Sequence, residues 1–154
     1  SPLDPKSIDP DWLQEYQLAQ EHNLNTHLFS YDDFANNQNH LSLAKKYQSN
    51  SIEKIIYRGW MMPIGMYERL YHSLMNINLQ LINSPAQYEH CYYLPNSYDI
   101  IKGHTPLSMF SHSNRLPSDE ELIKLLSIFN NNPIIIKDYV KSQKHYVTGE
   151  NILR

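Results

Sequence analysis

A β-α-β pattern in the middle of the chain constrains the fold more than any other feature of the sequence. Residues 54–58 form a short β-prone run that ends before Gly59, and residues 79–82 form a second one. Between these runs, apolar side chains recur at the i, i+3, i+4, i+7 spacing of an amphipathic helix: Tyr67, Leu70, Tyr71 and Leu74. Strands that alternate with helices predict an α/β fold, in which helices flank a sheet.

The N-terminal part of the sequence contains a well-marked helix start. Asp9 is a candidate N-cap and Pro10 follows at the first helical position, so a helix is expected over residues 10–22. Residues 26–29 then predict a short strand. The asparagine-rich residues 36–40 predict an exposed loop.

Two capping boxes mark helix starts further along the chain. Residues 84–87 have the sequence Ser-Pro-Ala-Gln and predict a short helix that ends before Pro95. Residues 118–121 form the second box, and the helix that it opens carries an apolar stripe of Leu122, Leu125, Leu126 and Phe129. This helix is expected to end at the asparagine run of residues 130–132.

Basic residues follow two of the predicted strands. Residues 134–136 are consecutive isoleucines, which predict a strand buried on both faces with Lys137 at its end. Arg58 stands in the same position at the end of the run at 54–58. Because open α/β sheets bind ligands at the carboxyl ends of their strands, we expect Arg58 and Lys137 to meet one anionic ligand.

Lysines recur in the segment that begins at Lys137. Lys141 and Lys144 follow within a few residues, and Asp138 is the single acid among them. Lysine ammonium groups and backbone N–H groups of such a loop can close over a polyphosphate. The alternative is a solvated basic turn, because short lysine runs usually lie on wet surfaces.

The overall composition sets limits on partners and location. A chain of 154 residues with 41% hydrophobic residues suits one globular domain or part of one. Its formal net charge of -3 provides no general field for nucleic acid or an anionic membrane. Cys91 is the single cysteine, and no apolar run approaches the roughly 20 residues that span a bilayer. We expect a cytoplasmic protein without a nucleic-acid or membrane partner.

Other polar residues allow competing interpretations. His90, Cys91, His104 and His112 are of zinc-ligand types, but their spacing matches no known zinc arrangement, and no metal ligand is expected among them. His104 and Thr105 lie in a turn-like loop between apolar segments. There they either contact a substrate or cap neighbouring backbone groups.

Four segments together resemble one group of enzymes in order and spacing. They are YRGWMMP at 57–63, LINSPAQYEHCYYLPNSY at 81–98, KGHTP at 102–106 and PIIIKDYVKSQKH at 133–145. The resemblance is to the ATP-grasp superfamily, in the clade named for one signature arginine and two signature lysines. It implies a pre-ATP-grasp-like domain over residues 1–116 and the start of an ATP-grasp domain over residues 117–154.

The resemblance also implies roles for single residues. Arg58 is similar to the signature arginine and would be catalytic. Lys137 resembles a lysine that contacts phosphate, and Lys141 and Lys144 would lie on the loop that covers the nucleotide. His104 and Thr105 would contact substrate. The family's magnesium ligands come from a later half, and this chain ends at Arg154 without residues that match them.

The implied reaction is an ATP-dependent carboxylate–amine ligation. The γ-phosphoryl group of ATP passes to a carboxylate, and an amine then attacks the acyl phosphate. Catalysis of this kind consists mostly of charge neutralisation and positioning, with magnesium bridging the phosphates. A peptide, protein or amino acid is the implied substrate. The alternative is a truncated or degenerate module that binds nucleotide or protein without turnover.

Overall fold

The computed structural model describes residues 7–36, 41, 43, 47, 50–111, 115, 117–130 and 132–136. The chain divides into two compact units, Ser1–Tyr88 and Glu89–Arg154. The domain boundary expected between residues 116 and 117 is a different division and stays a prediction. In the described part of the chain, α-helices accompany a small parallel sheet, which confirms the expected mixed α/β class.

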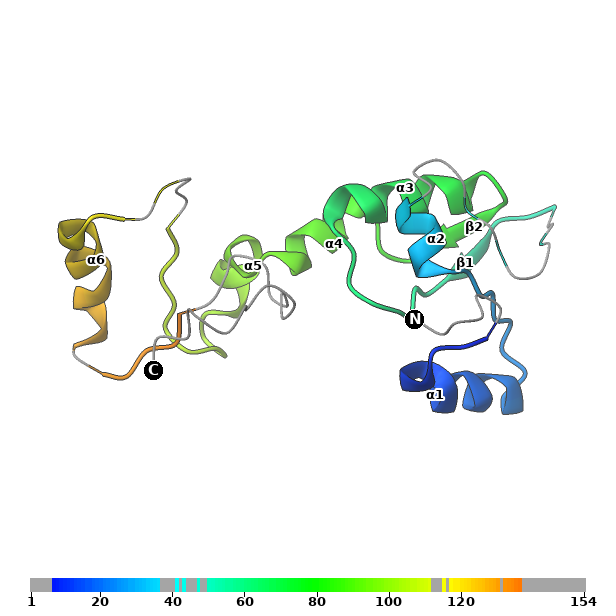
Figure 1. Ribbon diagram of the computed structural model, residues 1–154, viewed down its shortest axis with the longest axis horizontal. Helices are drawn as coiled ribbons and strands as arrows, with labels where there is room; N and C mark the ends of the chain where they lie inside the picture. The colour runs from blue at the N-terminus through cyan, green and yellow to red at the C-terminus, as the bar shows by residue number, and fades with distance from the viewer. Residues whose placement is uncertain are drawn as a thin grey trace. The chain divides into compact units, whose positions relative to one another are not determined.

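The elements follow one another in a simple order (Figure 1). They are α1 (Pro10–Glu21), α2 (Tyr31–Asn36), β1 (Glu53–Ile55), α3 (Ile64–Met75), β2 (Leu79–Leu81), α4 (Pro85–Tyr92), α5 (Leu94–Ile101), α6 (Asp119–Leu126) and the 3-10 helix η1 (Ser127–Phe129). Among the described residues, no helix combines the length and the apolar character needed to cross a membrane.

The β-α-β unit predicted from the sequence is present in the first unit. β1 and β2 pair in parallel with Lys54 opposite Gln80, and α3 connects them. The pairing ends where the amide of Ile82 donates to the carbonyl of Ile55 at 3.0 Å. β1 is therefore shorter than expected: it ends at Ile55, and Arg58 lies three residues beyond the strand. β2 likewise ends early, at Leu81 instead of the expected Ile82.

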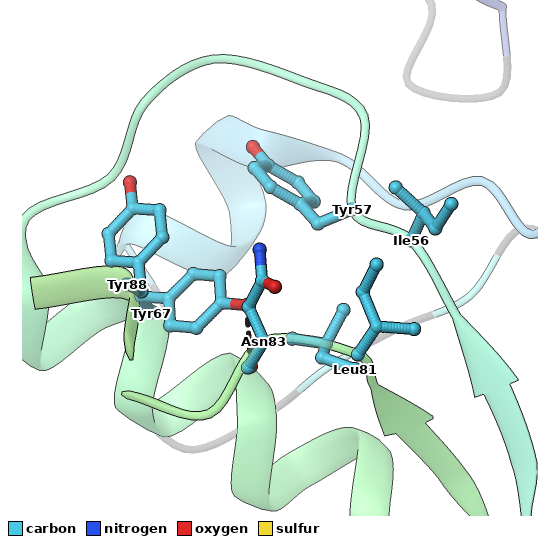
Figure 2. Close-up of a pocket in the computed structure, with 7 residues that line it drawn as sticks. Ile56, Tyr57, Tyr67, Leu81, Asn83 and Tyr88 are labelled. Atoms are coloured by element: carbon cyan, nitrogen blue, oxygen red, sulfur yellow. Dashed lines mark hydrogen bonds between the residues drawn. The ribbon is translucent and has the colours of Figure 1, made fainter. Parts of the chain in front are cut away.

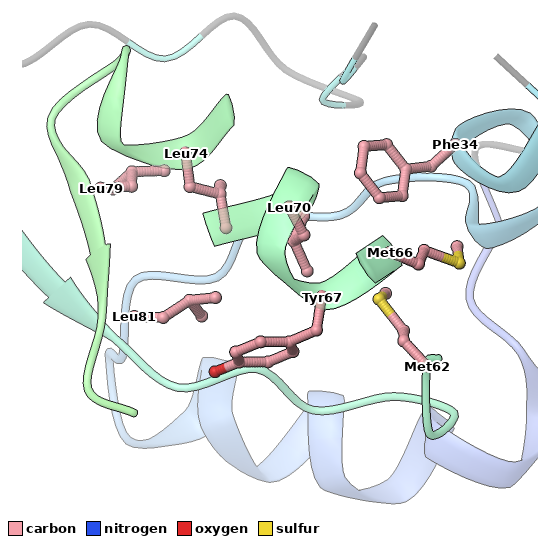
Figure 3. Close-up of a cluster of buried hydrophobic side chains, with 8 residues drawn as sticks. All are labelled: Phe34, Met62, Met66, Tyr67, Leu70, Leu74, Leu79 and Leu81. Atoms are coloured by element: carbon pink, nitrogen blue, oxygen red, sulfur yellow. The ribbon is translucent and has the colours of Figure 1, made fainter. Parts of the chain in front are cut away.

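The hydrophobic core lies between α3 and the sheet (Figure 3). Its buried side chains come from α3, β2, α2 and the segment before α3: Phe34, Met62, Met66, Tyr67, Leu70, Leu74, Leu79 and Leu81. The α3 stripe buries Tyr67, Leu70 and Leu74 as predicted, while Tyr71 is partly buried at the edge. Amphipathic spacing places these side chains on one helix face, and burying that face stabilises the helix.

Local capping explains the first two helices. The carboxylate of Asp9 accepts from the amide of Asp11 at 3.0 Å, so the predicted start of α1 is confirmed. The strand expected over residues 26–29 is wrong, because Phe29 alone forms an isolated antiparallel bridge with Leu43. The unexpected α2 follows directly, with the Ser30 hydroxyl accepting from the amide of Asp33 at 3.2 Å. Residues 37–40 of the expected loop lie outside the described residues.

Both capping boxes are confirmed. At the start of α4, the Ser84 amide donates to the Gln87 side chain at 2.8 Å, and the Gln87 amide donates to the Ser84 hydroxyl at 3.3 Å. The box of Ser118 and Glu121 starts α6 in the same reciprocal way. α4 ends before Pro95 as expected. Pro95 itself lies in the first turn of α5, a helix that the sequence reading missed, because proline fits the start of a helix as well as it ends one.

The C-terminal strand expected at residues 134–136 is not observed. Ile134, Ile135 and Ile136 lie outside any strand and are 39%, 84% and 75% exposed. A β-prone run becomes a buried strand only beside a partner strand, and the described residues pair only β1 with β2 in a sheet. The stripe on α6 is likewise not buried, with Leu122 and Leu126 about two-fifths exposed.

Candidate functional site

A small pocket lies at the carboxyl ends of the two strands (Figure 2). Its volume is about 70 Å³, and it is lined by residues that follow or end the strands and by α3 and α4: Ile56, Tyr57, Tyr67, Leu81, Ile82, Asn83 and Tyr88. This is the edge at which α/β sheets bind ligands. Pockets that enclose whole drug-sized ligands measure roughly 300–1,000 Å³, so this one has room for a small group and not for a nucleotide.

The three tyrosines of the pocket are held by backbone carbonyls. The hydroxyl of Tyr57 donates to Trp60 at 2.7 Å, that of Tyr67 to Asn83 at 3.0 Å, and that of Tyr88 to Met62 at 3.0 Å. These bonds fix the orientation of the three rings. The rings of Tyr67 and Tyr88 also stack, with centroids 3.8 Å apart and planes 2° apart.

The pocket carries no charge near neutral pH. Burial raises the pKa of Tyr57 far above its usual range. It raises the pKa of Tyr67 to about 12, with smaller contributions from Tyr88 and Tyr71. Both phenols therefore stay protonated and cannot act as bases. Among the described residues, the side-chain amide of Asn83 has no hydrogen-bond partner, so it is the polar group that a ligand in this pocket would meet.

Arg58 does not line this pocket and forms an ion pair instead. Its Nε lies 2.6 Å from Oε1 of Glu15, and its Nη2 lies 3.0 Å from Oε2. The guanidinium carbon lies 5.6 Å from the ring centroid of Trp12, and the Trp12 and Trp60 rings meet edge to face at 6.5 Å. The hydrogen-bonded pair lowers the pKa of Glu15 and raises the pKa of Arg58.

The sequence predicts Arg58 as a site residue but does not predict its partner, Glu15. Glu15 lies 43 residues earlier, on α1, and is one of several acids in the N-terminal part of the chain. No local spacing rule links the two positions. The signal that the sequence does offer is weak: Glu15 lies three residues after Trp12, on the same helix face, and Arg58 lies two residues before Trp60.

The other predicted site residues belong to the second unit. His104 and Thr105 follow α5 in the second unit, where the amide of His104 donates to the carbonyl of Ile101 at 2.8 Å. Neither side chain has a hydrogen-bond partner within the described part of the chain. Lys137, Lys141 and Lys144 lie outside the described residues, so their proposed contact with phosphate remains a prediction.

The described residues do not fit a magnesium site. No group of three or more histidine, cysteine, aspartate or glutamate side chains converges anywhere in that part of the chain. Magnesium is held by carboxylate and other oxygen ligands, usually together with substrate phosphates.

Comparison with known proteins identifies no protein similar to this chain. The chain matches no model of a protein family, no curated protein and no solved structure. The resemblance to ATP-grasp enzymes thus rests on the sequence alone.

Proposed function

We propose that this chain is part of an ATP-dependent carboxylate–amine ligase of the ATP-grasp superfamily. In the reaction, a carboxylate oxygen attacks the γ-phosphorus of ATP and ADP leaves. An amine then attacks the carbonyl carbon of the acyl phosphate and releases phosphate. The amide product joins two substrates, one of which is a peptide, protein or amino acid.

The observation that carries this proposal is the order of the four segments at 57–63, 81–98, 102–106 and 133–145. The parallel β-α-β unit is compatible with it, because the first of these segments begins two residues after the end of β1. Ligands of α/β sheets bind at that edge. In the proposed enzyme, Arg58 binds an anionic group of the substrate, and Lys137, Lys141 and Lys144 bind the phosphates of ATP.

Calorimetric titration of ATP with magnesium tests the nucleotide site. We expect the chain to bind ATP and Lys137→Ala to lose binding, because the ammonium group of Lys137 neutralises phosphate charge. Lys124→Ala, which removes the same charge from exposed α6, is the matched control and should bind as the unaltered chain does. Absence of binding by the chain, or equal binding by both variants, would contradict the assignment.

A second candidate function is a module that binds its partner without turnover. The observation that favours it is the ion pair of Arg58, whose guanidinium group is already paired with the carboxylate of Glu15. Trapping with hydroxylamine separates the two functions, because an acyl phosphate is converted to a hydroxamate. Hydroxamate formation that depends on ATP and a carboxylate supports the ligase. ATP binding without ADP release supports the module.

A further inference from the structure

The side chains around Arg58 are arranged as a carboxylate site that is already filled. Glu15 presents both carboxylate oxygens to the guanidinium, at 2.6 Å and 3.0 Å. This bidentate geometry is the one that arginine adopts with a bound carboxylate ligand. Glu15, which occupies the site, comes from α1. Arg58, which binds it, comes from the segment after β1.

The Glu15 carboxylate is held weakly enough for a ligand to displace it. The side chains of Arg58 and Glu15 are 61% and 47% exposed, and exposed ion pairs contribute little to stability. Within α1, which is described throughout, no side chain is buried. The side chain of Glu15 can therefore turn away from Arg58 without opening the core.

Aromatic surface beside the guanidinium indicates what the ligand carries besides its carboxylate. Trp12 lies under Arg58, and Trp60 meets Trp12 edge to face. Trp60 is 48% exposed, and the neighbouring Met61 is 42% exposed. The indole N–H of Trp12 is shielded from solvent and has no acceptor among the described residues.

We propose that Arg58, Trp12 and Trp60 form a binding site for an organic carboxylate with an apolar or aromatic body, and that Glu15 occupies this site until the ligand displaces it. If the chain is part of the proposed ligase, this carboxylate is the group that receives the phosphoryl group of ATP, and in that respect the inference rests on the proposed function. Binding of the carboxylate itself needs no nucleotide. Glu15 then acts as an internal competitor, which sets how much carboxylate is needed to fill the site.

The chain reports on this site directly, because its two tryptophans are Trp12 and Trp60. Tryptophan emission, excited where tyrosine does not absorb, is followed while N-acetylphenylalanine is added without ATP. N-acetylphenylalaninamide supplies the same body without the carboxylate, and inorganic phosphate supplies an anion without the body. Three variants are compared with the unaltered chain: Glu15→Gln, Arg58→Gln and Glu121→Gln.

Glu121→Gln is the matched control. Glu121 forms a bidentate pair with Arg115 at 2.7 Å and 2.8 Å, and these side chains are 47% and 64% exposed. The variant therefore removes the same charge from a pair of the same kind in the second unit. It should bind N-acetylphenylalanine as the unaltered chain does.

The proposal predicts a specific order of affinities. Glu15→Gln should bind N-acetylphenylalanine roughly two- to five-fold more tightly than the unaltered chain, since an exposed pair of this kind contributes little. Arg58→Gln and the amide probe should show no binding. Equal affinities of Glu15→Gln and the unaltered chain would overturn the proposal. So would binding of phosphate as tight as that of N-acetylphenylalanine, because the aromatic surface would then contribute nothing.

Far-UV circular dichroism checks that Arg58→Gln is folded. If it is not, the comparison of Glu15→Gln with the unaltered chain still tests the proposal. Failure here is distinct from failure of the proposed function. Carboxylate binding without any ATP binding would leave this site standing and remove the ligase proposal. ATP binding that depends on Lys137, without tighter carboxylate binding by Glu15→Gln, would support the ligase proposal and remove the carboxylate site.

Discussion

The hydroxyl of Tyr88 hydrogen-bonds both backbone polar groups of Met62. It accepts from the Met62 amide at 2.9 Å and donates to the Met62 carbonyl at 3.0 Å. Met62 is fully buried, so water cannot replace Tyr88 at these groups. One phenol thus attaches α4 to the segment that connects β1 and α3.

Replacing Tyr88 with phenylalanine should destabilise the first unit by about 1–3 kcal/mol, the cost of leaving buried backbone groups without partners. The shift in the urea midpoint of unfolding measures this cost. Tyr16→Phe is the control, because the hydroxyl of Tyr16 has no hydrogen-bond partner among the described residues. Equal midpoints for the two variants would show that Met62 finds other partners.

Leu70 should be among the least replaceable residues of the core. Its side chain is fully buried between α3 and the sheet. Leu70→Ala removes buried methyl groups and leaves a cavity, so the free energy of unfolding should fall by about 2–5 kcal/mol. Leu24→Ala, at a position that is 61% exposed, should change it by less than about 0.5 kcal/mol. Denaturant unfolding of both variants provides the comparison.

Alkaline pH should destabilise the first unit through Tyr67. Burial raises the pKa of Tyr67 from 10.0 to about 12, so the folded state retains a proton that the unfolded chain releases earlier. The stability gained from the neutral phenol is complete below pH 10.0 and is lost as pH rises through about 12. In Tyr67→Phe, the midpoint of unfolding should fall less steeply over this interval. Ionisation of every tyrosine near pH 10.0 would contradict this expectation.

Acid should weaken the start of α6 through Glu121. Hydrogen bonds from Arg115, and then from the amide of Ser118, lower the pKa of Glu121 from 4.5 to about 2. The contribution of the ionised carboxylate is therefore present above pH 4.5 and is lost as pH falls through about 2. NMR titration of the Glu121 carboxyl group should show this low value. Arg115→Gln should raise it, and an unchanged value in that variant would exclude Arg115 as the main cause.

The parts of the fold that the sequence predicts are those encoded over a few residues. The start of α1 depends on Asp9 and Asp11, which are two positions apart, and each capping box spans four residues. The α3 stripe depends on spacing within one helix. Such signals act before the chain packs, so they can be read without knowing what lies nearby.

The parts that the sequence did not predict depend on distant partners. Residues 134–136 have strong β propensity, but a strand also requires a neighbour with free backbone groups. Phe29 has one such neighbour in Leu43 and forms a single bridge rather than a strand. β propensity alone therefore overpredicted strands at both places.

The same distinction applies to the candidate sites. Arg58 can be selected from the sequence because a charged residue follows a β-prone run. Its pairing with Glu15 depends on how α1 lies in the folded first unit. The stacking of Tyr67 on Tyr88 likewise joins two helices. Residue type identifies candidates for a site, and tertiary packing decides which of them meet.

The uneven distribution of buried side chains has a thermodynamic consequence. Among the described residues, the first unit buries eight apolar side chains in one cluster, whereas the second unit buries one hydrophobic residue, Tyr92. The heat-capacity increment of melting comes mainly from apolar surface that becomes hydrated. A calorimetric transition of this chain should therefore report mainly the melting of the first unit, and its total enthalpy should be that of a protein about half as long.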